Sequence, residues 1–290
     1  MKYKAPIALF VYNRLAHLKN TIKALQKNEG ALESELFIFS DGPRIPDDES
    51  RVVEVREYIR TIGGFKAITI VEQKNNLGLA DSIISGVTKI LENYSSCIIV
   101  EDDLVTSPNF LNFMNEGLVK YRSVTNVASI HGYVYPAPIL PTKPFFLRGA
   151  DCWGWATWSD RWMLFEKDAN ILLTNIEENK LKFYFNFFGT FPFYKMLLAS
   201  ARGEISSWAI RWNASIYVEN MLTLYPPKSL VSNIGNDGSG THSEKSQYFN
   251  SEMIEFDTSS LPDTAKPSVR GKFSFALYFL LMRIKRKLKL

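Results

Sequence analysis

Short apolar runs alternate with segments of helical periodicity along the first hundred residues. An apolar run of this kind predicts a buried strand, and apolar residues spaced three or four apart predict one face of a helix. Strands that alternate with helices favour a mostly parallel sheet with helices on both faces, so we expect an α/β fold. The predicted strands are 7–12, 36–39, 67–71 and 97–100, and the predicted helices are 18–25, 52–62 and 79–91.

Polar side chains follow each of the four predicted strands. Open α/β sheets bind ligands at the carboxyl ends of their strands, so these side chains are expected to share one crevice. They are Asn13 and Arg14, then Asp41, then Glu72 with the loop 75–78, and finally Glu101, Asp102 and Asp103. Beyond the crevice, Ser107-Pro108 predicts the start of a helix that the serine side chain caps.

The run Glu101-Asp102-Asp103 follows the last of these strands directly. Three consecutive carboxylates repel one another, and burial makes that repulsion costly unless a cation neutralises them. Mg²⁺ or Mn²⁺ shared with a diphosphate is a suitable cation, because such ions take one or two carboxylates and complete their shell with phosphate oxygen and water. The alternative is an acidic turn in water. The first reading predicts an enzyme that handles a nucleotide-linked substrate.

Bulk composition fits a globular protein with a sizeable core, at 46% hydrophobic and 22% charged residues. Cys97 and Cys152 have no metal-ligand spacing, so a reduced cytosolic compartment is expected. No secretory signal is predicted, because Asn13-Arg14 ends the first apolar run too soon. No transmembrane span is predicted either, because the apolar stretch 273–282 is about half as long as a bilayer requires.

Basic residues gather at the end of the chain. After Asp263 the sequence holds eight Lys and Arg residues and no acid, so its net charge of +4 hides an acidic globule with a basic tail. We therefore expect no nucleic-acid partner. In the tail, Leu277, Leu280, Leu281, Ile284 and Leu288 share one helical face. A basic, apolar helix predicts binding to an anionic membrane surface; the alternative is a helix docked on its own domain with a solvated basic end.

Several motifs, taken in order, resemble those of GT-A-fold glycosyltransferases. The relatives that the sequence most resembles are bacterial family-2-type enzymes similar to the inverting N-acetylglucosaminyltransferase I. The resemblance spans roughly residues 5–243. It implies a GT-A glycosyltransferase domain over 1–262, with a nucleotide-binding half (1–103) and an acceptor half (104–262), followed by the tail 263–290. The motifs are PIALFVYNR (6–14), FSDGP (39–43), NLGLA (76–80), VEDDL (100–104), CWGWATW (152–158), SWAIRW (207–212) and NIGNDGSGTH (233–242).

The resemblance implies roles for the donor-site residues. Asp103 is expected to ligate Mn²⁺ or Mg²⁺ on the diphosphate, with Glu101 on the same side of the chain and Asp102 facing ribose or sugar hydroxyls. Asp41 is expected to accept the N3–H of a uracil or thymine base, and Arg14 to pair with base or phosphate. The remaining donor-site candidates are Asn13, Gly78 and Asp81 near the crevice, with Trp155 and Arg211 from the second half.

The aromatic second half leaves more open. One of Trp153, Trp155 and Trp158 is expected to touch sugar or acceptor while the others pack. Inversion requires a carboxylate base, but the stretch 208–212 that corresponds to the relatives' acidic segment has no acid. Glu204 is the first candidate for this base and Asp151 the second. The glycine-rich stretch 233–242 is expected to close over the diphosphate, with His242 as a further metal contact.

These inferences predict a metal-dependent glycosyltransferase that moves a sugar from a nucleoside-diphosphate sugar, expected to be a UDP-sugar, with inversion. We expect a hexosyl or N-acetylhexosaminyl transfer to a glycan or lipid-linked saccharide in bacterial surface polysaccharide synthesis, at the inner face of the cytoplasmic membrane. One alternative is a sugar-1-phosphate nucleotidyltransferase, although the chain lacks that class's Gly-rich loop after the first strand. Another is a non-catalytic, membrane-docked sugar-nucleotide binder.

Overall fold

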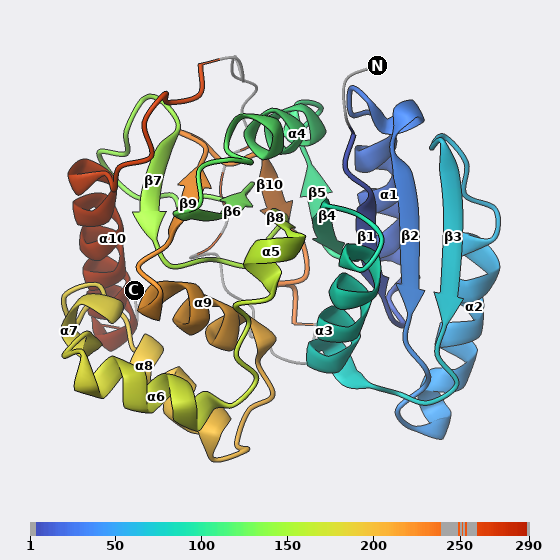
Figure 1. The fold of residues 1–290 in the computed structure, drawn as a ribbon. Helices are drawn as coiled ribbons and strands as arrows, with labels where there is room; N and C mark the ends of the chain where they lie inside the picture. The colour runs from blue at the N-terminus through green and yellow to red at the C-terminus, as the bar shows by residue number, and fades with distance from the viewer. Residues whose placement is uncertain (1–3, 239–248, 250, 252, 254–259, 289–290) are drawn as a thin grey trace.

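The fold is that of a computed structural model, which describes residues 4–238, 249, 251, 253 and 260–288. In this part of the chain one sheet of eight strands has the order β3-β2-β1-β4-β8-β6-β9-β7 (Figure 1). The strands are β1 (Ile7–Val11), β2 (Glu35–Ser40), β3 (Ala67–Glu72), β4 (Ser96–Glu101), β6 (Val127–His131), β7 (Phe145–Arg148), β8 (Trp155–Trp158) and β9 (Leu222–Tyr225). A separate two-stranded sheet joins β5 (Leu104–Thr106) to β10 (Val231–Asn233).

The first half of the chain forms the parallel part of the large sheet. Strands β1 to β4 pair in parallel, and every predicted strand and helix in this half is present. The predicted α/β fold, a mostly parallel sheet flanked by helices, is therefore confirmed. The helices of this half are α1 (Leu15–Gln26), α2 (Glu49–Ile59) and α3 (Gly78–Leu91), and two short 3-10 turns lie at η1 (Ala31–Glu33) and η2 (Pro46–Asp48).

The second half extends the same sheet through an antiparallel strand. Strand β8 pairs antiparallel with both β4 and β6, so the chain that precedes β8 returns to the carboxyl end of β4. This arrangement brings the aromatic half of the molecule to the predicted crevice. The helices of this half are α4 (Phe110–Lys120), α5 (Ser159–Trp162), α6 (Ala169–Glu178), α7 (Lys182–Phe185), α8 (Phe193–Ala201), α9 (Trp208–Val218) and α10 (Val269–Leu288).

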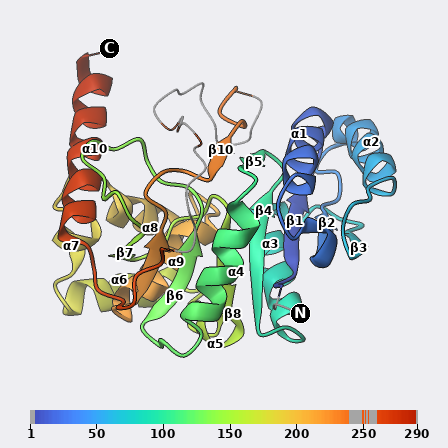
Figure 2. The ribbon, with the colours of Figure 1, turned by 90° about the horizontal axis from the view of Figure 1, so that it is seen from above.

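Side chains that alternate along the central strands feed two cores. In β1, Ile7 and Leu9 join a core shared with α1, α2, α4 and α10, whereas Ala8 and Phe10 face α3 and α9 on the other side. Figure 2 shows these helices in layers on either side of the sheet. The period of two along a strand thus explains why runs that read as uniformly apolar are buried on both faces.

Two terminal features refine the predictions. Helix α4 begins at Phe110, later than predicted, and the Ser107 side chain makes no capping bond; the Ser107 carbonyl instead accepts from the Phe110 amide. Helix α10 packs one face onto the domain, where the Ser274 hydroxyl donates to the Pro138 carbonyl. No helix in the described residues is long and apolar enough to cross a membrane.

A glycine in α3 tests how tightly this helix packs on the sheet. A Cβ at Gly86 would lie 2.6 Å from Cε1 of Phe10, a buried ring of β1, so Gly86→Ala is expected to destabilise the fold by about 1–3 kcal/mol through overpacking. Gly63→Ala is the matched control, because nothing lies within 4 Å of a Cβ there. Urea denaturation measures both free energies of unfolding, and equal values for the two variants would contradict this packing.

Candidate active site

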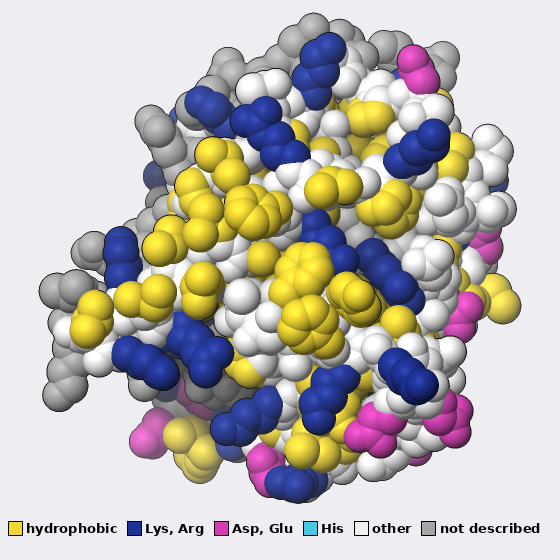
Figure 3. Space-filling view, turned by 90° about the vertical axis from the view of Figure 1, so that its left-hand side faces the viewer, with side chains coloured by type: hydrophobic (Ala, Val, Ile, Leu, Met, Phe, Trp, Pro, Cys, Tyr) yellow, Lys and Arg dark blue, Asp and Glu magenta, His cyan; other side chains and the backbone are white. Residues whose placement is uncertain are grey.

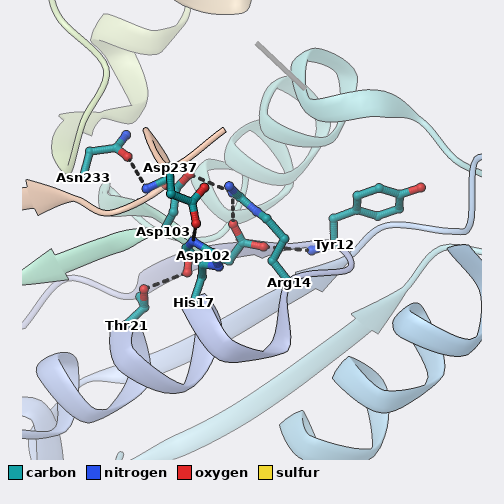
Figure 4. Close-up of polar contacts among 9 residues, drawn as sticks. Tyr12, Arg14, His17, Thr21, Asp102, Asp103, Asn233 and Asp237 are labelled. Carbon is teal, nitrogen blue, oxygen red and sulfur yellow. Dashed lines mark hydrogen bonds and ion pairs between the residues drawn. The ribbon is translucent and has the colours of Figure 1, made fainter. Parts of the chain in front are cut away.

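The acidic run at the end of β4 is buried and paired with an arginine. Asp102 is 5% exposed and Asp103 9% exposed, and both follow β4 directly. Nη2 of Arg14, from the loop after β1, lies 2.5 Å from Oδ1 of Asp102 and 2.7 Å from Oδ2 of Asp103 (Figure 4). The Thr21 hydroxyl of α1 donates a hydrogen bond of 2.8 Å to the Asp102 carbonyl. The predicted meeting of the first and fourth strand ends is therefore present.

The pKa values show that the ionised forms of Glu101 and Asp102 remain unfavourable even though Arg14 lies beside the acidic run. Burial, followed by the charges of Asp103 and Asp102, raises the pKa of Glu101 well above its usual range. Burial raises the pKa of Asp102 to about 6, against the lowering effect of Arg14. Burial opposes the charge on Arg14, but the two aspartates outweigh it and raise its pKa. One guanidinium thus leaves negative charge that a further cation would stabilise.

A segment after β10 covers the acidic run. The Ile234 amide donates to the Asp103 carbonyl at 2.9 Å, and the Gly235 amide donates to Oδ1 of Asn233 at 2.7 Å. A Cβ at Gly235 would lie 2.1 Å from Oδ2 of Asp103, so only glycine permits this approach. Asp237 reaches across to His17 of α1, with Oδ2 at 3.1 Å from Nε2 (Figure 4). The described part of the predicted lid therefore lies over the site, whereas His242 falls outside the described residues.

Asp41 lies at the crevice, and its carboxylate caps the amino end of the neighbouring helix α3. Its carboxylate accepts from the amides of Leu77 and Gly78 at 2.8 and 2.9 Å and from Nδ2 of Asn76 at 3.0 Å. A fourth bond comes from the Gly42 amide at 2.8 Å. These bonds cap the first turn of α3 and use the acceptor positions of the carboxylate. Base recognition by Asp41 stays a prediction, and the structure supplies a structural role that the sequence did not reveal.

The other donor-site candidates lie around the same edge. Asn13 donates through Nδ2 to the buried Asp48 at 2.9 Å, so its side chain secures the loop after β1. Gly78 has φ of +76°, in the left-handed region that favours glycine, and Asp81 is exposed in the first turn of α3. Arg211 of α9 donates to the carbonyls of Ser207 and Lys167, and burial lowers its pKa while Asp81 raises it.

In the tryptophan cluster, Trp155 and Trp158 are 0% and 1% exposed, and Trp155 stacks on Trp208 with ring centroids 5.2 Å apart. The assignment of Trp155 to the donor site is therefore corrected: a fully buried ring at the start of β8 has no exposed surface for a ligand. Trp153, which precedes β8, is half-buried and is the member of the cluster that reaches a cavity.

That cavity has a volume of about 160 Å³ and is lined by the half-buried Asp151. The Tyr135 hydroxyl donates to this carboxylate, and so does the Cys152 amide at 3.1 Å. Burial raises the pKa of Asp151 to about 6, although both hydrogen bonds lower it. Aromatic side chains form much of the wall, including Trp153, Phe191 and Phe193.

Cys152 shows that the cavity adjoins the acidic run. Burial raises the pKa of its thiol, and the charges of Asp151, Glu101 and Asp103 raise it further. The register agrees, because Ile99 of β4 pairs with Trp155 of β8, which places residues 151–154 beside the carboxyl end of β4. One carboxylate in an aromatic cavity therefore lies close to three carboxylates at the strand end.

The two predicted bases differ in their surroundings. The Glu204 side chain is 58% exposed on the loop between α8 and α9, where its nearest basic partner is Arg202 at 3.8 Å, and it does not line the cavity. Asp151 does line it. The structure therefore favours the second candidate over the first. Sequence reasoning missed Tyr135, because nothing in the local pattern indicates that a tyrosine after β6 meets a carboxylate before β8.

The carboxylates at the end of β4 fit a hard divalent cation that takes few of its ligands from the protein. No group of three His, Cys, Asp or Glu side chains arranged to hold a metal is present among the described residues. An ion bound through a nucleoside diphosphate needs only one or two protein carboxylates, since phosphate and water complete its shell. Burial, together with repulsion by Asp103 and Asp102, raises the pKa of Glu101, and this is the observation that favours a cation here. Asp103 with Glu101 is the pair that would hold it.

Comparison with known proteins gives partial likeness to solved structures only. No protein-family model matches the sequence, and no curated protein matches it. A mannosyltransferase, PcManGT from Pyrobaculum calidifontis in complex with GDP-Man and Mn²⁺, is 15% identical over 46% of this chain and 36% of that chain, with a TM-score of 0.32. S. aureus TarS is 11% identical over 52% of this chain and 25% of that chain, with a TM-score of 0.35. A TarS 1-349 structure is 10% identical over 61% of this chain and 49% of that chain, with a TM-score of 0.36. The chain thus spans less than half the length of each structure.

The capping role of Asp41 gives a testable loss of stability. Asp41→Ala leaves the amides of Leu77 and Gly78 without their acceptor, so we expect a loss of about 1–3 kcal/mol in the free energy of unfolding. Asp47→Ala, at an exposed aspartate of the neighbouring 3-10 turn, is the control and should change stability little. Urea denaturation measures both. An Asp41→Ala protein as stable as wild type would show that the cap is dispensable and return Asp41 to ligand binding alone.

Proposed function

We propose that this protein is a metal-dependent glycosyltransferase that moves a sugar from a nucleoside-diphosphate sugar to a saccharide acceptor. One observation carries the proposal: a carboxylate held in an aromatic cavity adjoins a buried acidic run at the carboxyl end of a parallel strand, and Cys152 lies between them. The acidic run suits a diphosphate with its cation, and the cavity suits an acceptor hydroxyl with its base.

On the donor side, Asp103 and Glu101 are the residues that would hold Mn²⁺ or Mg²⁺. When bound, the metal supplies Lewis-acid stabilisation of the negative charge on the departing diphosphate. Arg14 adds a fixed positive charge at the same strand ends, and its guanidinium geometry suits phosphate oxygens as well as carboxylates. The amide-rich segment 234–238 lies above these groups, where it would limit the access of water.

On the acceptor side, we propose Asp151 as the general base. Its carboxylate would take the proton of the acceptor hydroxyl while that oxygen forms a bond to the anomeric carbon. The bond from this carbon to the diphosphate oxygen breaks in the same step, and its electron pair leaves with the diphosphate. A pKa of about 6 leaves Asp151 ionised at neutral pH and basic enough to accept the proton. The Tyr135 hydrogen bond fixes the orientation of the carboxylate.

The finer assignments are supported by the sequence motifs. On that basis we propose inversion, a UDP-sugar donor, hexosyl or N-acetylhexosaminyl transfer, and a glycan or lipid-linked saccharide acceptor of bacterial surface polysaccharide synthesis. Two structural facts weigh against the alternatives. Helix α1 begins at Leu15, so only three residues separate it from β1 and leave no room for the Gly-rich loop of a nucleotidyltransferase. The cavity with Asp151 supplies a base that a non-catalytic binder has no need of.

The donor site is tested by calorimetric titration with UDP, GDP, CDP and dTDP, each with Mn²⁺ and with EDTA. We expect one nucleotide to bind in a metal-dependent way. Asp103→Asn should lose at least tenfold in affinity with metal, because a neutral amide is a weaker ligand for a hard cation. The control Asp47→Asn should bind as wild type does. Binding that is indifferent both to EDTA and to Asp103→Asn would remove the acidic run from the donor site.

The base is tested through the pH dependence of transfer. Asp151 must be ionised to accept a proton, so the transfer rate is expected to fall as pH drops below about 6, with a midpoint that the raised pKa sets. Asp151→Asn should lower the rate by about 100-fold or more and abolish this fall in rate at low pH. Glu204→Gln is the matched control and should keep both the rate and its fall at low pH. The reverse result would return the role to Glu204.

The same pKa predicts a change in stability that needs no substrate. Because the pKa of Asp151 rises from 3.8 to about 6 on folding, the folded protein binds this proton more tightly than the unfolded chain. Stability from this group is thus fully present below pH 4 and is lost as pH rises through about 6, a cost of about 3 kcal/mol at pH 7. Asp151→Asn should therefore be more stable than wild type at pH 7 and similar at pH 4. Equal stability at both pH values would contradict the buried, ionised carboxylate.

A further inference from the structure

An exposed apolar surface joins two elements that are distant in the sequence, helix α7 with its following loop and helix α10. We call it the α7–α10 face. In Figure 3 hydrophobic side chains gather over this side of the molecule with Lys and Arg side chains around them. Its apolar members are Phe183, Tyr184, Phe188, Phe273, Leu280, Leu281, Ile284 and Leu288, each between 38% and 61% exposed.

Helix α10 has a row of apolar side chains that does not pack against its own domain. Its buried face packs through Phe275, Phe279 and Met282, which lie on the opposite side of the helix from the exposed row. The docked helix and the exposed row predicted from the sequence are therefore both present, on two faces of one helix. Residues 283–288 are all exposed, and Figure 2 shows the end of α10 projecting past the rest of the molecule.

The α7 loop brings aromatic rings to the same surface. Phe183, Tyr184 and Phe188 contact one another with ring centroids 5.5 to 5.9 Å apart. Nζ of Lys272, from α10, lies 5.0 Å from the Tyr184 ring and 4.7 Å from the Phe188 ring, so the two elements are in contact. The backbone at Phe187 and Phe188 is left-handed, with φ of 46° and 60°. Bulky residues rarely adopt this conformation, and here it presents Phe188 to solvent while Phe187 packs against Phe279.

The charged residues of the two segments that form this face have one sign, although Glu177 of α6 lies beside Lys180 and Lys182. Neither 180–188 nor α10 contains an acidic residue. Their basic residues are Lys180, Lys182, Arg270, Lys272, Arg283, Lys285, Arg286 and Lys287. Aromatic and aliphatic side chains ringed by Lys and Arg fit the interface of an anionic bilayer, where the apolar groups enter the headgroup region and the cations meet lipid phosphate. We propose that the α7–α10 face docks on an anionic membrane surface, with the α7 aromatic loop as a second anchor beside α10.

Docking would also place the catalytic cavity near the lipid surface. Phe279 of α10 contacts Phe191 and Phe193, whose rings line the cavity, with centroids 4.5 and 6.3 Å away. Tyr135, the hydrogen-bond partner of Asp151, contacts Phe275 and Phe279 on the same helix. One side of α10 thus faces lipid and the other forms part of the support of the cavity. The docking proposal rests on the surface alone and not on the proposed reaction.

Vesicle co-sedimentation of the whole protein tests this proposal. The vesicles are phosphatidylcholine alone or phosphatidylcholine with phosphatidylglycerol, at physiological salt. We expect binding to the anionic vesicles to exceed binding to the neutral ones by at least tenfold. Phe183→Ser/Phe188→Ser should weaken anionic binding about tenfold or more. Lys285→Gln/Lys287→Gln should weaken it by about fivefold for each lysine. Leu32→Ser/Val53→Ser, at exposed apolar residues of η1 and α2, should leave it unchanged.

Other outcomes overturn the proposal in distinguishable ways. Equal binding to both vesicles, or to neither, removes the anionic membrane as the occupant of this face. Unchanged binding by the Phe183→Ser/Phe188→Ser variant removes the α7 loop as an anchor. A dimer in sedimentation velocity that the same substitutions dissociate would show that the face joins two copies of the chain instead. Urea denaturation serves as the folding check for every variant, and nucleotide binding that persists after loss of vesicle binding separates docking from the donor site.

Discussion

The ion pairs from Arg14 to Asp102 and Asp103 are the interaction on which the candidate site depends. They join the carboxyl ends of β1 and β4, two strands that are adjacent in the sheet but about ninety residues apart in the chain. Buried carboxylates that lose their only cationic partner are strongly destabilising, so Arg14 permits an acidic run to exist at a buried strand end. The pKa values of Glu101 and Asp102 remain raised even so, chiefly through burial, so the ionised forms of both carboxylates stay unfavourable and a further cation would favour them. The proposed cation site would therefore draw on the same four side chains that join these strand ends.

A reversal of strand direction supplies the rest of the site. If β8 ran parallel to β4, the residues before it would lie at the far edge of the sheet from the acidic run. Its antiparallel pairing instead returns 151–154 to the crevice and brings a carboxylate with an aromatic cavity beside the strand ends. Strand β6 pairs with the other edge of β8, and helix α9 packs against Trp155 of β8. The bipartite character of the site thus follows from one pairing in the sheet.

Much of the first half could be predicted from the sequence, because its elements are set by local periodicity. Every predicted strand between 7 and 100 is present, and side chains at neighbouring strand ends meet in two groups, Arg14 with Asp102 and Asp103, and Asp41 with 76–78. The aromatic half was harder, because tryptophans in a core and tryptophans on a ligand surface have the same local pattern. Burial at the start of β8 decides against Trp155, and that is a property of tertiary packing. Asp151 and Glu204 were likewise separable only by their surroundings, as was the contact of Asp151 with Tyr135.

The approach of Gly235 to Asp103 has a kinetic consequence. The backbone of 234–235 lies against the carboxylate that is expected to meet the cation, and it is tied to the Asp103 carbonyl and to Asn233. In the proposed donor complex, a diphosphate with its ion would need the space that this segment occupies, so the segment would have to move before the complex forms. Association then includes a unimolecular step, and its observed rate should approach a plateau at high nucleotide concentration, whereas simple collision gives a straight line. Because the side chain of Gly235 is a single hydrogen atom, it sets how closely the segment 234–235 can lie against Asp103.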